Sequence, residues 1–307
     1  MKVLVIGASG HIGSYLVKEL IREQHEVYAV MRGERIPYGY DEKIWSKVKM
    51  LKMSRDELCE SDIFDKTEFD VVCDLIAYSL DSVKKLLLKI KNDIFYIQIG
   101  SIWMYGNKVY LPVDERHPKN GLEEYGKQKG LIEEFLFELV KQNKLRATVI
   151  HPGHVSGKGW DPINPQGNKD MSFYHKVKNG EEIILPFLGI TTLQHVHSYD
   201  LANIIIACIN KQDVANGEAF NAVCEKAMTN RSLCEYVYNF YGKKSKIRYV
   251  NWEEFVETVG ERHSNATLDH AIHSPCCSVE KAKNILGVKI RYSITDIFDE
   301  YLRYINI

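Results

Sequence analysis

The sequence predicts an α/β fold built on a doubly wound parallel sheet, with a smaller C-terminal lobe of mixed α/β structure. Two observations support this prediction. The apolar run at residues 3–6 ends in a glycine-rich turn and passes into a helical pattern, and strand and helix patterns then alternate as far as residue 151. Such alternation predicts a parallel sheet with helices on both faces. Beyond residue 151 the chain is richer in proline and glycine, which indicates a second region.

The individual elements follow from hydrophobic periodicity. Predicted strands lie at residues 3–6, 26–31, 47–52, 69–75, 94–99 and 146–151, and predicted helices at 12–21, 82–90 and 122–142. Six strands in this order are typical of a Rossmann-type sheet. For the remainder we expect helices and strands at 196–209, 219–223, 233–241, 247–250 and 294–304.

The glycine-rich turn at residues 7–13 has the composition of a phosphate cradle. Without a Cβ, Gly7 can take a sharp turn, Gly10 lets the backbone approach a pyrophosphate, and Gly13 lets the helix pack closely on the strand. The helix N-terminus is then aimed at the anion. The spacing is Gly-x-x-Gly-x-x-Gly, and its place at the start of a strand-helix unit favours dinucleotide binding over an ordinary turn.

Domain boundaries follow from the change in composition. The segment 157–167 contains Pro162, Pro165 and three glycines. Ligands sit in loops at the carboxyl ends of parallel strands, so we expect this segment to begin a substrate lobe. We predict a dinucleotide-binding domain at 1–155, to which 190–223 returns, and a substrate-binding lobe formed by 156–189 and 224–307.

Composition and charge limit the classes of function. The chain has 307 residues, with 40 Lys and Arg against 41 Asp and Glu and a formal net charge of −1. This balance argues against nucleic acid or an anionic membrane as a partner. The seven cysteines show no Cys-x-x-Cys spacing, and we expect them to be reduced in a cytoplasmic protein. The N-terminus has no signal-peptide core, and no stretch reaches transmembrane length.

A second group of residues predicts the chemistry. Tyr125 and Lys129 lie four residues apart on the predicted helix 122–142, so both side chains emerge on one face. Ser101 follows the fifth strand, where a parallel sheet delivers residues to the ligand crevice. We expect the Lys129 ammonium to lower the pKa of Tyr125, so that this phenol exchanges a proton with a substrate hydroxyl or carbonyl while a nicotinamide exchanges the hydride. Ser101 would hold the same oxygen.

With these motifs the sequence resembles the extended short-chain dehydrogenases/reductases, also called the NAD-dependent epimerase/dehydratase family. The matching stretches are 7–13, 100–106, 125–129, 151–157, similar to the family's Arg-Pro-x-x-Val-Tyr-Gly turn, and 194–202, similar to its His-Val-x-Asp-Leu-Ala helix start. The resemblance implies a bound NAD(P), a catalytic set of Ser101, Tyr125 and Lys129, and a small-molecule substrate, most often a nucleotide sugar. It also allows a homodimer formed through the helix that carries Tyr125 and Lys129.

The same resemblance places the binding residues. Expected cofactor contacts are Gly7, Ser9, Gly10, His11, Ile12, Gly13, Arg32, Leu75, Ile76, Ala77, Lys129, Pro152 and His154. Expected substrate contacts are Ser101, Trp103, Tyr125, His154 and His195. An alternative for four histidines is a zinc site: His151, His154, His195 and His197. We expect no metal, because the same segments match family turns that bind none.

Departures from the family pattern narrow the activity. In the family's 4,6-dehydratases an Asp-Glu pair follows the position of Ser101, and the related decarboxylases keep the glutamate; here these positions are Ile102 and Trp103. Neither side chain can move a proton, which leaves hydride transfer alone, or hydride removal and return. The arginine of the Arg-Pro turn is His151, which weakens any substrate contact carried over to that position.

Cofactor choice depends on the end of the second strand. NAD enzymes usually place an acidic residue there, whereas this chain has Met31-Arg32-Gly33, with no acid until Glu34. Arg32, and also Arg35, could pair a 2′-phosphate, so we expect NADP in preference to NAD. The alternative is that Arg32 stacks over the adenine and both cofactors bind.

Three functions remain open. The first is an NAD(P)-dependent reductase or dehydrogenase acting on a keto or hydroxyl carbon of a nucleotide-linked sugar. The second is an epimerase with a retained NAD. The third belongs to another class, a catalytically idle dinucleotide-binding or RNA-associated scaffold on the same fold. The intact Ser101, Tyr125 and Lys129 set argues against idleness, and the charge balance argues against RNA.

Overall fold

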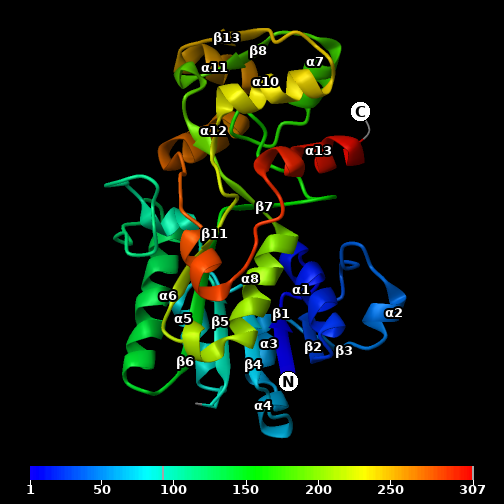
Figure 1. Ribbon diagram of the computed structural model, residues 1–307, viewed down its shortest axis with the longest axis vertical. Helices are drawn as coiled ribbons and strands as arrows, with labels where there is room; N and C mark the ends of the chain where they lie inside the picture. The colour runs from blue at the N-terminus through cyan, green and yellow to red at the C-terminus, as the bar shows by residue number, and fades with distance from the viewer. Residues whose placement is uncertain (92, 306–307) are drawn as a thin grey trace. The chain divides into compact units, whose positions relative to one another are not determined.

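The computed structural model describes residues 1–91 and 93–305 (Figure 1). The chain divides into two compact units. The first comprises Met1–Pro152, Ser198–Ala222 and Val279–Lys289, and the second Gly153–His197, Val223–Ser278 and the segment from Ile290 onward. The return to the first unit therefore begins at Ser198, because residues 195–197 pair with residues 154–156 inside the second unit.

A seven-stranded parallel sheet forms the centre of the first unit, in the order β11-β6-β5-β4-β1-β2-β3. This confirms the predicted Rossmann-type fold. The six expected strands are present, and the predicted strand at 219–223 adds a seventh beside β6. The strands are β1 (Lys2–Ile6), β2 (Glu26–Met31), β3 (Lys49–Lys52), β4 (Val71–Asp74), β5 (Phe95–Ile99), β6 (Arg146–Pro152) and β11 (Ala219–Ala222).

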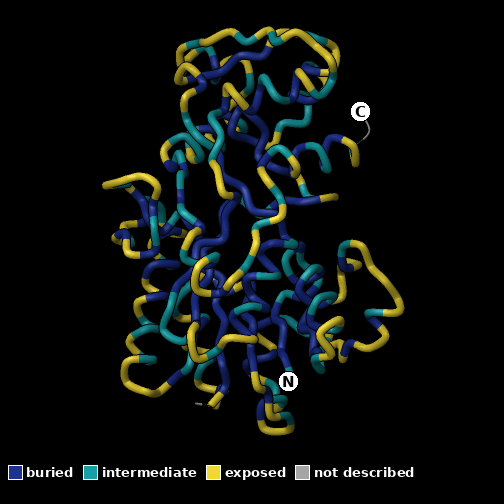
Figure 2. Tube along the Cα trace, in the orientation of Figure 1, coloured by how far each residue is buried: buried dark blue, intermediate teal, exposed yellow. Residues whose placement is uncertain are grey.

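Helices cover both faces of this sheet. They are required because side chains along a strand point alternately to the two faces, and apolar residues on both faces must be buried. Leu4 and Ile6 share a core cluster with Val83 and Leu86 of α5 and with residues of α6. Figure 2 shows the strands buried along most of their length, apart from the exposed edge strand β3. Helix α1 packs beside α8. The helices of this unit are α1 (His11–Arg22), α2 (Glu42–Trp45), α3 (Arg55–Glu60), α4 (Ile63–Lys66), α5 (Leu80–Leu87), η1 (Ile102–Tyr105), α6 (Glu124–Lys141), α8 (Ser198–Asn210), α9 (Gln212–Ala215) and η3 (Ala282–Leu286).

The second unit is a mixed α/β lobe with three short strand pairs. Pairs β7 with β10 and β8 with β13 are parallel, and β9 with β12 is antiparallel. Its core holds Phe173, Tyr238 and Phe298, all fully buried. The elements are β7 (His154–Ser156), α7 (Ser172–Asn179), β8 (Ile183–Leu185), η2 (Phe187–Gly189), β9 (Thr192–Leu193), β10 (His195–His197), β12 (Met228–Thr229), α10 (Asn230–Phe240), β13 (Ile247–Tyr249), α11 (Trp252–Val259), α12 (Glu261–His273) and α13 (Ile294–Ile305).

Helices α7, α11 and α12 were not predicted from the sequence. Gly260 separates α11 from α12 with a φ of 82°, and polar residues dominate α12, so its apolar period is weak. Among residues 1–91 and 93–305, no helix combines the length and apolar character needed to cross a membrane.

The glycine-rich turn has the geometry that its sequence predicts. Gly7 has a φ of 90°, a conformation that L side chains rarely adopt. A Cβ on Gly13 would lie 2.5 Å from the Gly7 carbonyl oxygen and 2.6 Å from the Ala8 Cα. Helix α1 can therefore approach β1 this closely only with glycine at position 13.

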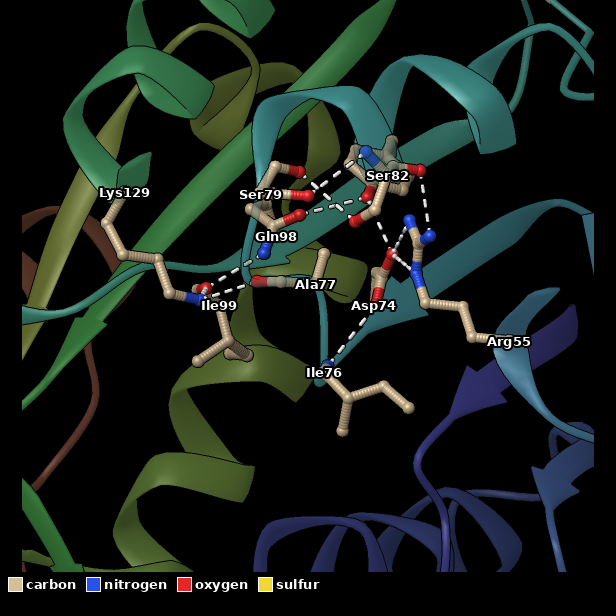
Figure 3. Close-up of polar contacts among 10 residues, drawn as sticks. Arg55, Asp74, Ile76, Ala77, Ser79, Ser82, Gln98, Ile99 and Lys129 are labelled. Atoms are coloured by element: carbon tan, nitrogen blue, oxygen red, sulfur yellow. Dashed lines mark hydrogen bonds and ion pairs between the residues drawn. The ribbon is translucent and has the colours of Figure 1, made fainter. Parts of the chain in front are cut away.

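A buried ion pair holds the carboxyl end of β4 (Figure 3). Asp74 is fully buried, and its Oδ2 accepts hydrogen bonds from Arg55 Nε at 2.9 Å and Tyr96 Oη at 3.0 Å. Arg55 Nη1 donates to the Ser82 carbonyl at 2.7 Å. The pair thus joins the end of β4 to the starts of α3 and α5.

Replacing Arg55 by Met should lower the free energy of unfolding by about 3–5 kcal/mol, because the Asp74 carboxylate would stay buried without its counter-charge. Urea denaturation measures this change. Arg303→Met is the matched control, since the Arg303–Asp299 pair is exposed and such pairs contribute about 0–1 kcal/mol. Equal losses of unfolding free energy in the two variants would contradict the stabilising role given to Arg55 beside Asp74.

Candidate active site and cofactor crevice

A pocket of about 620 Å³ lies at the carboxyl ends of β1 to β4, the edge of a doubly wound sheet where ligands bind. Five of the predicted cofactor residues line it: Gly7, Ser9, Gly10, Arg32 and Ile76. The turn is braced from behind, because Gly7 N–H donates to the Val30 carbonyl of β2 at 3.1 Å. The pocket has the position and size expected for part of a dinucleotide.

The other predicted cofactor residues do not line this pocket. His11 is 4% exposed and packs against the rings of Tyr15 and Tyr38, at centroid distances of 5.4 and 5.1 Å. Gly13 faces the turn itself. Five further predicted cofactor residues are also absent from the pocket lining: Ile12, Leu75, Ala77, Lys129 and Pro152. His154 belongs to the second unit.

Sequence reasoning missed part of the pocket wall. Met53, Ser54 and Arg55 follow β3, and Tyr78 follows β4. The sheet order places β3 beside β2, so the residues that follow β3 lie at the same edge as Arg32. The signal was available in the predicted strand order, since loops at the carboxyl ends of neighbouring parallel strands share one crevice.

Arg32 stands at the rim of the pocket. Its Nη2 lies 3.2 Å from Glu34 Oε2, and the two side chains are 70% and 68% exposed. Arg35 lines the same pocket. An exposed pair of this kind contributes about 0–1 kcal/mol, so Arg32 can leave Glu34 for a stronger anion at little cost.

Lys129 is the best fixed of the three catalytic candidates. It is 2% exposed, and its Nζ donates to the carbonyls of Ala77 and Ile99, both at 2.7 Å (Figure 3). The ammonium therefore bridges the chain that leaves β4 to the last residue of β5. Its Nζ also lies 5.6 Å from the centroid of the Tyr125 ring.

Ser101 and Tyr125 come together beside it. Ser101 follows β5 and caps η1, where its Oγ accepts the Trp103 N–H at 3.2 Å. The Ser101 hydroxyl lies close enough to the Tyr125 phenol to lower the pKa of that phenol. The Trp103 and Tyr125 rings meet edge to face at 6.3 Å, so Trp103 borders the phenol, while Ile102 is buried.

Burial controls the titration of this group. It lowers the pKa of Lys129 to about 8. Partial desolvation raises the pKa of Tyr125, which is 39% exposed, and the Ser101 hydroxyl offsets only part of this rise. Our expectation that Lys129 depresses the Tyr125 pKa below its usual value was therefore wrong for this structure. Desolvation of the phenolate outweighs the stabilising contacts.

The two predicted substrate histidines lie in the second unit, on the paired strands β7 and β10. The rings of His154 and His195 meet edge to face at 5.2 Å. Burial lowers the pKa of both, that of His195 to about 3, so both imidazoles are neutral near pH 7. His195 Nε2 accepts the Ile163 N–H at 3.1 Å, which fixes that loop. No group of three His, Cys, Asp or Glu side chains within the described residues could hold a metal ion.

The geometry can be compared with known proteins. The UDP-glucose 4-epimerase of Mus musculus is 28% identical over 316 residues, covering 88% of this chain and 90% of the relative. The chloroplast stem-loop binding protein of 41 kDa b of Arabidopsis thaliana is 27% identical over 312 residues, covering 98% of this chain and 78% of that protein.

Solved structures share the fold. The UDP-glucose 4-epimerase of Thermotoga maritima with UDP-glucose superposes with a TM-score of 0.74 at 20% identity, covering 100% of this chain and 99% of that chain. That of Thermus thermophilus, in complex with NAD, gives 0.71 at 15% identity, covering 100% and 99%. The family model for the NAD dependent epimerase/dehydratase family matches residues 3–86 and 80–222. The chain therefore belongs to the NAD dependent epimerase/dehydratase family.

Proposed function

We propose that this protein is an NAD(P)-dependent oxidoreductase that transfers a hydride to or from a hydroxyl-bearing carbon of a nucleotide sugar. The observation that carries the proposal is the grouping of Ser101, Tyr125 and buried Lys129 at the strand ends of a dinucleotide-binding fold. The glycine turn fits the cofactor, since Gly7 takes the positive φ of a sharp turn and Gly13 lets α1 begin close against that turn, which brings the helix N-terminus to the end of β1.

Each residue of the group has a role. A bound nicotinamide would supply or accept the hydride. Tyr125 takes the proton from the substrate hydroxyl on oxidation and returns it on reduction. Ser101 holds the same oxygen by a hydrogen bond, and Lys129 supplies a nearby positive charge while its carbonyl partners keep it in place. Trp103, His154 and His195 are proposed substrate contacts.

Two reactions use this chemistry. A reductase or dehydrogenase exchanges its cofactor after each turnover, whereas an epimerase removes a hydride and returns it to the other face. The relatives named UDP-glucose 4-epimerase favour epimerisation, and exposed Arg32 favours exchange of an NADP-type cofactor. Dehydration is disfavoured because Ile102 and Trp103 cannot move a proton. The stem-loop binding relative favours RNA association as a second candidate.

A homodimer through α6 is part of the proposal. Leu131 on this helix is 44% exposed, whereas Ile132 is buried against the sheet. An exposed leucine on the helix that carries Tyr125 is consistent with a helix-to-helix contact between two copies, and size-exclusion chromatography with light scattering measures it.

Replacing Tyr125 by Phe should reduce turnover about 10²- to 10⁴-fold, because the phenol that moves the proton is lost. The assay incubates the protein with UDP-glucose or UDP-galactose and each dinucleotide, and separates the products chromatographically. Epimerisation interconverts the sugars without net change in the dinucleotide, whereas net oxidation or reduction consumes it stoichiometrically.

The control for this prediction is Tyr304→Phe, at an exposed position on α13, which should retain wild-type turnover. Cofactor affinity of Tyr125→Phe should stay within about twofold of wild type. Full turnover by Tyr125→Phe would remove the proposed role. Tight, salt-resistant RNA binding by a protein that turns over no nucleotide sugar would favour the second candidate.

We further propose that Arg32 makes NADP the preferred cofactor. Replacing Arg32 by Ala should weaken NADPH binding about tenfold and leave NADH binding within about twofold, since only NADPH carries the 2′-phosphate. Thermal-shift titration with each dinucleotide measures both affinities. Arg116→Ala removes another exposed arginine, outside the pocket, and is the control. Equal wild-type affinities for NADH and NADPH would refute the preference.

The lowered pKa of Lys129 predicts a specific pH dependence of stability. Between about pH 8 and the ordinary lysine value of 10.5, the unfolded chain holds a proton that the folded protein has released. The free energy of unfolding therefore rises with pH across this window, and the cost of the buried charge is fully present below pH 8. The gain is about 3 kcal/mol for the whole window.

Urea denaturation of wild type and Lys129→Met at pH 7, 8, 9 and 10 measures this gain. The wild type should gain about 2–3 kcal/mol relative to Lys129→Met between pH 8 and pH 10. Lys127→Met, at an exposed position on the same helix, is the matched control. A pH-independent difference between wild type and Lys129→Met would contradict the burial of a charged ammonium.

A further inference from the structure

The catalytic face of α6 continues one turn beyond Lys129. Tyr125, Lys129 and Glu133 are spaced by four residues, so their side chains lie along one face of the helix. Glu133 is 5% exposed, and its Oε2 lies 2.6 Å from His151 Nε2. Lys119 Nζ approaches the other carboxylate oxygen at 3.2 Å. Glu133 therefore anchors α6 to a strand of the sheet through a close buried contact with His151.

His151 connects this anchor to the peptide that precedes Ser101. The imidazole is fully buried on β6, and a Cβ on Gly100 would lie 2.3 Å from its Nδ1. Gly100 N–H donates to the Ile150 carbonyl at 2.7 Å, which holds the peptide against β6. The Nδ1 side of the ring thus packs against Gly100, next to Ser101, while Nε2 faces Glu133.

Several contacts fix the orientation of α6. Lys129 ties it to the ends of β4 and β5, and Ile132 and Leu136 pack in the core of the first unit. Glu133 adds a polar attachment to β6 one turn beyond Lys129. Contact between α6 and η1 is also close, because a Cβ on Gly126 would lie 2.8 Å from the Trp103 carbonyl oxygen. A pivot of α6 would therefore move Tyr125 relative to Ser101.

The surroundings of Glu133 favour its carboxylate form. Burial alone would raise the Glu133 pKa, but the neighbouring His151 and Lys119 side chains lower it below its usual value. A buried pair of this kind adds little net stability, because desolvation offsets much of the attraction. What it supplies is a fixed distance and direction between the two elements that it joins.

We propose that the buried Glu133–His151 contact is a positioning device that sets the separation of the Ser101 hydroxyl and the Tyr125 phenol. The two residues touch neither substrate nor cofactor and act through α6 and the Gly100 peptide. The inference rests on the proposed function only for its kinetic consequence. Its structural consequence, the Ser101 to Tyr125 separation, is independent of the reaction.

The test compares Glu133→Gln with wild type. We expect kcat to fall about 10- to 100-fold, as expected for a displacement of about 1 Å at the reacting groups, with KM and cofactor affinity within about twofold. Crystal structures of the two proteins should show a longer distance from Ser101 Oγ to Tyr125 Oη in the variant. The matched control is Glu134→Gln, the exposed neighbour on the same helix, which should behave as wild type.

Glu133→Asp serves if Glu133→Gln does not fold, since it keeps the buried charge beside Lys119 but shortens the reach toward His151. An unchanged Ser101 to Tyr125 distance, or wild-type kcat, in a folded variant would overturn the inference. Parallel losses of kcat and cofactor affinity would also overturn it, because they indicate general loosening of the fold. If wild type turns over no nucleotide sugar, the proposed function fails, and the crystallographic distance alone decides this inference.

Discussion

The active-site half of the first unit depends on one buried ammonium. Lys129 satisfies two carbonyl groups, those of Ala77 and Ile99, that lie where β4 and β5 stop and ladder hydrogen bonds end. An unpaired buried carbonyl is costly, so the lysine stabilises the two strand ends as well as serving the proposed chemistry. The same burial lowers its pKa to about 8. Structure and reactivity at this position are therefore set by the same contacts.

Close contacts between backbone segments fix the spacing of the elements in this unit. Glycine at positions 13, 100 and 126 allows α1 to meet β1, His151 to lie under the Ser101 segment, and α6 to meet η1. In each case a Cβ would lie within 3 Å of another atom, so the spacing of these elements is fixed by the absence of a side chain. The candidate site is thus built from rigid contacts between elements rather than from mobile loops.

Local sequence patterns predicted the strands and the longer helices of the first unit and the residues that share a helix face. The glycine spacing and the alternating periods predicted β1, α1 and the parallel sheet, and the four-residue spacing predicted that Tyr125 and Lys129 share a face. Contacts between distant residues were not predictable in this way. Arg55 and Asp74, or Glu133 and His151, meet only because the sheet brings β3, β4 and β6 to one edge. The Tyr125 pKa shift was missed because its sign depends on burial, which spacing does not reveal.

The second unit was predicted less well for a physical reason. Its strands are two or three residues long, too short to show a hydrophobic period. Its helix α12 carries many polar residues, so the apolar period of that helix is weak. The histidines illustrate the consequence. His154 and His195 were chosen by resemblance, yet burial keeps both neutral, so neither can serve as a cation near pH 7. Ile102 and Trp103 cannot move protons, and Tyr125 is the acid and base of the proposed mechanism. This limits the proposed chemistry to one proton moving with each hydride, which suits reduction or epimerisation and does not suit elimination.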